Sequence, residues 1–257
     1  MYWKDRQWTR SHKLLEQIEN FLSSTNYYVR AEDGRIHAKG GAQPHQSPWS
    51  FINDCPTRHC DLWNHVYFQV FGIIPMACRF SCWKVVMKPS TVKELFALEQ
   101  MLKKYEYSSK CGIDVRTYTD WPYAGFIYTS SMEQGRRVLA QMRQDIEWSF
   151  PAGHGVTAFL KRGCTEMEWN CPSDQWDGVS EETIEKEQQL NEIFVKDQQS
   201  ARQSDVVKQM VRARWISHAI SIGDLTWKEM VDDPSDYLPH TVKYDTDELK
   251  ERTASWI

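Results

Sequence analysis

The chain has 257 residues, of which 41% are hydrophobic and 26% are charged, which is ordinary for a folded globular protein and excludes a disordered or fibrous one. Its most apolar stretch, Val66 to Ala77, is interrupted by Gln69, Gly72 and Pro75 and is too short to cross a membrane. The start, Met1 to Arg6, mixes charges and leads into no apolar segment, so we expect a cytoplasmic protein without a signal peptide or a membrane partner.

The net charge of −4 is distributed unevenly along the chain. Residues 78–163 carry 13 Lys and Arg against 8 Asp and Glu, whereas residues 164–257 carry 10 against 20. A basic middle and an acidic tail indicate surfaces for different partners. The excess in the middle does not by itself establish nucleic-acid binding, which needs the basic side chains on one face.

The N-terminal segment, residues 1–77, is predicted to contain a helix, a hairpin and a loop that holds cysteines. From Lys4 to Ser24, apolar residues recur at roughly helical spacing. Two short extended runs, Tyr27 to Arg30 and Arg35 to Ala38, flank an Asp33-Gly34 pair, which is a hairpin signal. The stretch from Lys39 to Ser50 is rich in Gly, Pro, Gln and Ser, so we expect a loop there. This segment is expected to pack on the core that follows.

Residues 78–171 are predicted to form the core of the protein from four strands and two helices. Thr91 and Glu94 occupy the two positions of a capping box, so the first helix should begin directly after Thr91. The expected elements are a strand from Cys82 to Lys88, a helix from Thr91 to Tyr105, a strand from Cys111 to Thr119, a strand from Tyr123 to Ser130, a helix from Met132 to Trp148 and a strand from Gly155 to Trp169.

This βαββαβ order resembles the ferredoxin-like fold. The resemblance covers Cys82 to Trp169 and implies an α+β core with an antiparallel four-stranded sheet in the strand order 4-1-3-2. The fold hosts many unrelated functions, and its name does not imply ferredoxin chemistry. Function therefore has to be argued from particular side chains.

Residues 172–257 are predicted to form an acidic, helical C-terminal extension. The stretch from Glu181 to about Ser221 is charged and rich in Gln, with apolar residues at helical spacing, so we expect one or two long helices. The remainder contains Pro234 and Pro239 and is expected to wrap back over the core. The acidic helices are a candidate surface for a redox or other protein partner.

Seven cysteines carry the leading functional hypothesis. They are Cys55, Cys60, Cys78, Cys82, Cys111, Cys164 and Cys171. An odd number in a reducing compartment argues against a disulfide framework and leaves metal binding or simple burial. The spacings Cys55-x4-Cys60 and Cys78-x3-Cys82 form two close pairs, and Cys55 and Cys171 are each followed by proline, as a ligating cysteine is in bacterial ferredoxins.

The predicted topology brings several of these cysteines to one edge of the sheet. Cys78 and Cys82 are at the start of the first strand, and Cys171 follows the fourth strand, which pairs with the first. Cys111 opens the second strand, two strand positions and about 9–10 Å away, so it is the least suitable ligand of the four. The loop before the first strand is long enough to reach the same edge. We therefore predict Cys55, Cys60, Cys78 and Cys82 as the cofactor and metal ligands, with Cys171 as an alternative fourth ligand.

Four thiolates suit either a [4Fe–4S] cluster or a tetrahedral zinc ion. Zinc sites favour short Cys-x2-Cys knuckles, which this sequence lacks, whereas a cubane spreads its ligands more widely. The iron–sulfur cluster is therefore the leading cofactor and zinc the alternative. His59 and His65 are candidates to replace one thiolate. A third alternative is that the cysteines bind no metal and are simply buried, because buried cysteines often act as small hydrophobic residues.

A nucleic-acid-binding module of the RNA-recognition type is the alternative function. The predicted sheet displays Trp83, Tyr118, Phe126 and Tyr128, and aromatic side chains on a four-stranded sheet stack bases in such modules. The basic residues available for such a face are Lys103, Lys104, Lys110, Arg136, Arg137 and Arg143. The Lys/Arg-Gly-Phe-Gly-Phe motif of these modules is missing, and solvated helix faces explain the charges more simply.

Whether the protein is an enzyme stays open, because the sequence contains no complete catalytic motif. Neither Gly153-His154-Gly155 nor Lys161-Arg162-Gly163 matches a phosphate loop, and no nucleophile elbow, zinc-protease motif or EF-hand loop occurs. The leading hypothesis is thus an iron–sulfur protein in which the cluster has a redox or structural role. An interaction protein whose acidic helices bind a partner is a third possibility.

Overall fold

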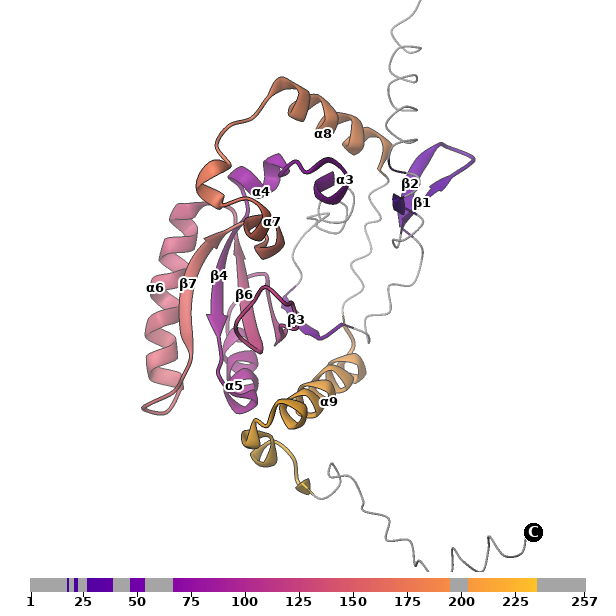
Figure 1. Ribbon diagram of the computed structural model, residues 1–257. Helices are drawn as coiled ribbons and strands as arrows, with labels where there is room; N and C mark the ends of the chain where they lie inside the picture. Colours follow the sequence, from indigo (N-terminus) through magenta and orange to yellow (C-terminus); the bar gives the residue numbers. More distant parts are fainter. Residues whose placement is uncertain are drawn as a thin grey trace, which may run out of the picture.

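The computed structural model describes Ile18 and residues 21–22, 27–38, 47–53, 67–194 and 203–234, and it combines helices with two antiparallel sheets (Figure 1). The larger sheet has the strand order β3-β5-β6-β4-β7. Its strands are β3 (Trp49–Asn53), β4 (Trp83–Lys88), β5 (Ser109–Ile113), β6 (Tyr123–Thr129) and β7 (Thr157–Arg162). The predicted mixture of helices and an antiparallel sheet is confirmed. The sheet has five strands rather than the predicted four, because β3 pairs with β5.

The hairpin predicted around Asp33-Gly34 is confirmed. β1 (Tyr27–Arg30) pairs antiparallel with β2 (Arg35–Ala38). Gly34 has a φ of 62°, a conformation that costs other residues more than glycine. The Asp33 carboxylate accepts a hydrogen bond from the Arg35 N–H at 3.0 Å, which stabilises the turn between the two strands.

Of the helix predicted from Lys4 to Ser24, the structure describes only Ile18, Phe21 and Leu22, which are helical. Ile18 and Leu22 are buried in a small core with the hairpin and with the end of α8 (Glu181–Ile193). The N-terminal hairpin therefore shares a core with a helix from the C-terminal segment.

Two helices cover one face of the large sheet, which we call the helix face. α5 (Val92–Leu102) begins at the predicted capping box, in which the Thr91 hydroxyl accepts from the Glu94 N–H and the Glu94 carboxylate accepts from the Thr91 N–H. α6 (Met132–Ser149) corresponds to the second predicted helix. Their apolar stripes pack on alternate residues of the strands and form the main core with them.

The long helical stretch predicted after residue 181 forms two helices, α8 and α9 (Asp205–Ile222). Arg212 of α9 donates to both carboxylate oxygens of the fully buried Glu99 in α5, at 2.9 and 3.0 Å. The hydroxyl of Ser50 in β3 donates to the same carboxylate at 2.7 Å. Burial alone would raise the pKa of Glu99, but the hydrogen bonds from Arg212 and Ser50 outweigh burial and hold the pKa below its ordinary value. This ion pair attaches α9 to the helix face.

β3 begins at Trp49, although the stretch from Lys39 to Ser50 was predicted to be a loop. The strand forms there because residues distant in sequence make hydrogen bonds to it. The side-chain oxygen of Gln203 accepts from the Phe51 N–H at 2.8 Å, and its side-chain nitrogen donates to the Trp49 carbonyl at 2.9 Å. The indole N–H of Trp215 in α9 donates to the Pro48 carbonyl at 2.9 Å. The edge strand therefore depends on the C-terminal segment.

Two strands end earlier than predicted. β5 stops at Ile113, since the chain then turns and the Arg116 guanidinium donates to Asp114 Oδ1 at 2.7 Å. β7 stops at Arg162, because Gly163 takes a φ of 60° and redirects the chain. The predicted strands Cys111–Thr119 and Gly155–Trp169 are therefore wrong beyond these two points.

Short helices gather at one end of the sheet, where Figure 1 shows α4 and α7 near the ends of β4 and β6. The short helices are α3 (Gln69–Phe71), α4 (Met76–Phe80), α7 (Thr165–Asn170) and η3 (Ser173–Gln175), while η4 (Leu225–Glu229) follows α9. Met167 and Trp176 are fully buried between them. Across the described ranges, the helices are too short or too polar to cross a bilayer.

Candidate functional site

The side of the large sheet opposite α5 and α6, which we call the pocket face, carries lysines among aromatic side chains. Side chains alternate between the two faces along each strand, and the strand register places one pocket-face residue of every strand in a single row. That row consists of Phe51 (β3), Lys110 (β5), Phe126 (β6), Val86 (β4) and Phe159 (β7).

Lys110 lies among three aromatic rings, two from this row and that of Trp49. Its Nζ is 4.4 Å from the ring centroid of Trp49 and 5.7 Å from those of Phe51 and Phe126. Trp49 and Phe126 contact each other edge to face, with centroids 5.5 Å apart. An ammonium above aromatic faces is held by cation–π attraction. The positive charge of Lys110 is thus fixed at a defined point on the pocket face.

The adjacent row contains two buried lysines. Lys84 and Lys161 pair across β4 and β7 and are only 8% and 7% exposed. The Lys84 Nζ lies 5.4 Å from the Tyr128 ring centroid and donates to Cys164 Sγ at 3.2 Å. The Lys161 Nζ donates to Glu168 at 2.6 Å; burial lowers the pKa of Lys161 in spite of this contact. Because burying ammonium groups opposes folding, two of them side by side suggest a functional role.

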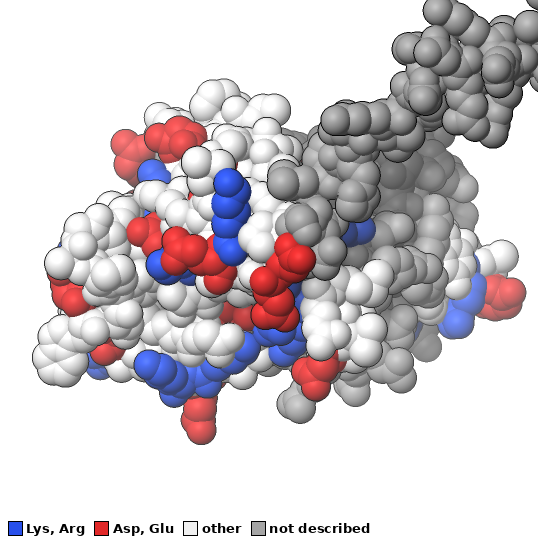
Figure 2. All heavy atoms as spheres, turned by 90° about the horizontal axis from the view of Figure 1, so that it is seen from below, with Lys and Arg blue, Asp and Glu red and all other residues white. Residues whose placement is uncertain are grey.

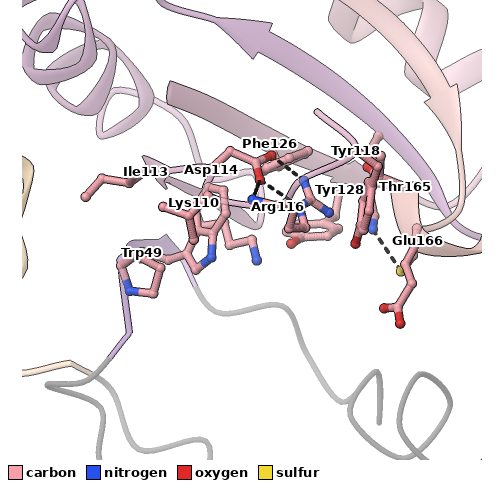
Figure 3. A pocket seen from close by; sticks show the side chains of 14 residues that line it. Trp49, Lys110, Ile113, Asp114, Arg116, Tyr118, Phe126, Tyr128, Thr165 and Glu166 are labelled. Atoms are coloured by element: carbon pink, nitrogen blue, oxygen red, sulfur yellow. Dashed lines mark hydrogen bonds and ion pairs between the residues drawn. The ribbon is translucent and has the colours of Figure 1, made fainter. Parts of the chain in front are cut away.

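A pocket of about 240 Å³ opens beside these lysines (Figure 3). Its aromatic and basic lining includes Trp49, Lys84, Lys110, Arg116, Phe126 and Tyr128. Figure 3 shows Asp114 and Arg116 facing each other, in agreement with their hydrogen bonds. Thr165 and Glu166, from the start of α7, line the side away from Trp49. The pocket is therefore formed by strands far apart in sequence, a loop and a helix.

Arg116, Tyr118 and Trp169 form a stack beside this pocket. The guanidinium carbon of Arg116 lies 5.5 Å from the Tyr118 ring centroid. Tyr118 in turn stacks on Trp169, with centroids 5.9 Å apart and planes inclined by 21°. Trp169 is 69% exposed. An exposed ring held nearly parallel to a second ring is a surface on which a planar ligand can stack.

The basic residues predicted to form one face are divided between the two sides of the sheet. Lys110 lies on the pocket face, whereas Arg143 of α6 donates to the Ala158 carbonyl at 3.0 Å and Arg137 of α6 pairs with Glu133 at 3.2 Å. Figure 2 views the molecule from below, where basic and acidic side chains lie next to one another. The pocket face is therefore distinguished by its combination of lysines and rings and not by charge alone.

Three of the four aromatic residues predicted for a binding surface line the pocket. Phe126 and Tyr128 extend from β6, while Tyr118 lies in the loop after β5 rather than on a strand. The prediction is wrong for Trp83. This residue is two positions from Val85 on β4 and so belongs to the helix face, where the Arg162 guanidinium carbon lies 5.8 Å from its ring.

The predicted metal ligands are described only in part. Cys55 and Cys60, together with His59 and His65, lie outside the described residues. Within the residues that the structure does describe, no group of three or more His, Cys, Asp or Glu side chains is arranged to hold a metal ion.

The predicted ligands that are described lie around α4 and α7. Cys78 is in α4, Cys82 directly precedes β4, and Cys171 directly follows α7. Cys78 and Cys82 are buried, and Cys171 packs against the apolar cluster that contains Cys78. Three of the five predicted ligands thus share one region of the fold.

Sequence reasoning missed Cys164, which is separated from the end of β7 by Gly163 alone. The Cys78 thiol is hydrogen-bonded to Cys164, and this contact together with burial raises the pKa of Cys78. The Gly163 N–H donates to the Cys82 carbonyl at 2.7 Å, so the end of β7 lies against the start of β4. Gly163 is the residue that could have indicated an earlier end of this strand, because a glycine within a strand pattern weakens the strand and often marks a bend. Cys111 lies elsewhere, in the helix-face core, where burial raises its pKa well above the ordinary value.

Comparison with known proteins gives no assignment. No protein-family model, curated protein or solved structure matches the chain.

Proposed function

We propose that the pocket face binds single-stranded nucleic acid, with a base in the pocket and phosphates near the lysines. The observation that carries the proposal is the position of Lys110, whose ammonium lies over three rings in one region of the sheet. Proteins that bind single strands combine rings, on which bases stack, with cations that attract the phosphates. The pocket face offers both kinds of side chain within reach of one nucleotide.

The topology supports the same function. We infer that β4-α5-β5-β6-α6-β7 is a ferredoxin-like arrangement with β3 added at one edge, because these four strands lie in the order β5-β6-β4-β7. RNA-recognition modules carry base-stacking aromatic residues on a four-stranded sheet. Phe126 and Tyr128 are on β6, a central strand, which is a suitable position for such contacts.

The size of the pocket favours part of a polymer over a whole cofactor. Its volume of about 240 Å³ is below the roughly 300–1,000 Å³ of pockets that enclose drug-sized ligands. A single base suits this volume, and the neighbouring nucleotide could stack on Trp169. The carboxylate of Asp114 is paired with Arg116, so it presents less negative charge to an approaching phosphate.

Fluorescence anisotropy with labelled single-stranded RNA and DNA tests this function. Lys110→Gln should weaken binding roughly tenfold, because one cation contact with a phosphate or ring contributes on the order of 1–2 kcal/mol. Lys104→Gln is the matched control, since it removes an exposed lysine from the turn after α5 and should leave the affinity unchanged. The function is refuted if the wild-type protein does not bind at low salt, or if both variants lose affinity equally.

The metal centre stays a prediction. Cys78, Cys82 and Cys171 lie in one region, whereas their predicted partners Cys55 and Cys60 lie outside the described residues. Measuring iron, sulfide and zinc in anaerobically purified protein tests it. About four iron atoms per chain would support a [4Fe–4S] cluster, one zinc would support the alternative, and neither metal would argue against both. A protein partner for the acidic C-terminal segment likewise stays a prediction.

A further inference from the structure

Cys164 lies beside two ammonium groups. Its Sγ accepts a hydrogen bond from the Lys84 Nζ at 3.2 Å, and the charge of Lys161 interacts with the same sulfur. Both lysines are more than nine-tenths buried, so water screens their charges weakly. An ammonium group at this distance stabilises the negative charge that develops on the sulfur as it gives up its proton during a nucleophilic attack.

A second thiol is in contact with this sulfur. The side chains of Cys78 and Cys164 are hydrogen-bonded to each other, and they belong to one apolar cluster with Met167 and Trp176. Cys78 extends from α4, whereas Cys164 directly precedes α7, so the contact joins two parts of the chain that are far apart in sequence. A second thiol in contact with a reactive one can resolve its oxidised form as a disulfide.

The sulfur of Cys164 can be reached by a small molecule. Cys164 lines the pocket described above, next to Lys84, Thr165 and Glu166. Its exposed fraction is 8%, which excludes bulky reagents from direct contact but leaves an approach through the pocket. A small, neutral and polar oxidant is the kind of molecule that fits this route.

We propose that Cys164 is a peroxide-reactive cysteine and that Cys78 is its resolving partner. The Cys164 sulfur attacks one oxygen of hydrogen peroxide or a small organic hydroperoxide; an S–O bond forms, the O–O bond breaks, and water or an alcohol leaves with the proton of the Cys164 thiol. Cys164 is thereby oxidised to a sulfenic acid and the peroxide is reduced. The Cys78 sulfur then attacks Cys164, an S–S bond replaces the S–O bond, and the hydroxyl leaves as water with the thiol proton. An external dithiol returns both residues to thiols by exchange. This reaction requires no bound nucleic acid, although the peroxide and the proposed base would enter the same pocket.

Peroxide titration of the fully reduced protein, followed by peptide mass mapping, tests the reaction. The wild-type protein should lose two thiols and form a Cys78–Cys164 disulfide, at a rate above that of free glutathione. In Cys78→Ser, the reaction should stop at a Cys164 sulfenic acid that a dimedone probe labels. Lys84→Met should slow the oxidation roughly tenfold, because the nearest ammonium is gone.

Cys111→Ser is the matched control, since this thiol is fully buried in the helix-face core and should not affect the reaction. Circular dichroism of each variant shows whether the fold is retained; if Cys78→Ser fails to fold, Cys78→Ala and the wild-type peptide map give the same information. The inference is overturned if Cys164→Ser reacts as fast as the wild type. A disulfide between other cysteines, or stoichiometric iron or zinc on Cys78, would overturn it equally.

Discussion

The helix face and the pocket face of the large sheet are built from alternate residues of the same strands, yet their chemistry differs. The helix face packs aliphatic strand residues against α5, α6 and α9, and its buried carboxylate, Glu99, has Arg212 as a partner. The pocket face instead holds Lys84 and Lys161 in low-exposure positions among rings. Residues that stabilise the fold and residues whose burial opposes it thus lie on opposite sides of one sheet, which is in keeping with the binding role proposed for the pocket face.

The largest expected effect is on the helix face, at the ion pair between α9 and α5. Arg212→Met leaves the buried Glu99 carboxylate without its two guanidinium hydrogen bonds, which should reduce the free energy of unfolding by about 3–5 kcal/mol near neutral pH. Urea unfolding measures this loss. An unchanged midpoint would show that α9 contributes little to the stability of the sheet.

The same pair predicts a pH dependence. The pKa of Glu99 in the folded protein lies below its ordinary value of 4.5. The ion pair therefore contributes its full stabilisation of the folded state above pH 4.5, and this contribution is lost as the pH falls through the pKa that Glu99 has in the folded protein. The difference between wild type and Arg212→Met should therefore shrink when unfolding is repeated below about pH 4. A difference that stays constant with pH would exclude Glu99 as its source.

A somewhat smaller loss is expected from removing apolar contact on the helix face. Leu98 is fully buried in α5, and Leu98→Ala should reduce the free energy of unfolding by about 2–5 kcal/mol through lost burial and the resulting cavity. Thermal or urea unfolding checks this, and affinity for single-stranded nucleic acid should be unchanged at temperatures where the variant is folded. If folded Leu98→Ala bound nucleic acid more weakly than the wild type, the proposal that the two faces of the sheet have separate roles would be contradicted.

The smallest effect on stability is expected on the pocket face. Lys84→Met replaces a buried ammonium by an apolar side chain of similar length, so the free energy of unfolding should change by less than about 1 kcal/mol or increase. Affinity for single-stranded nucleic acid should nevertheless fall, because one cation is lost from the pocket. Strong destabilisation in this variant would show that Lys84 is structural.

Local signals in the sequence predicted the elements that depend on local interactions. Thr91 and Glu94 are three residues apart and indicate the start of α5, and the Asp33-Gly34 pair indicates the hairpin. β3 could not be predicted in this way, because its hydrogen bonds come from Gln203 and from β5, which are distant in sequence.

The candidate site was predictable only in part for the same reason. Phe126 and Tyr128 were identified as aromatic residues of a binding surface, since period-2 alternation along a strand can be read from sequence. The contact between Lys84 and Cys164 depends on where β7 ends, and that is set by the φ of Gly163. Extending this strand to Trp169 made Cys171 the expected neighbour of Cys78 and concealed the contact with Cys164.

The two hydrogen bonds of Gln203 have a consequence for solubility. An edge strand with unpaired N–H and C=O groups can recruit a strand from another molecule and start aggregation. By accepting from the Phe51 N–H and donating to the Trp49 carbonyl, the amide of Gln203 imitates a neighbouring backbone and occupies the groups that an intruding strand would need. One side chain thereby shields the margin of β3 against intermolecular pairing.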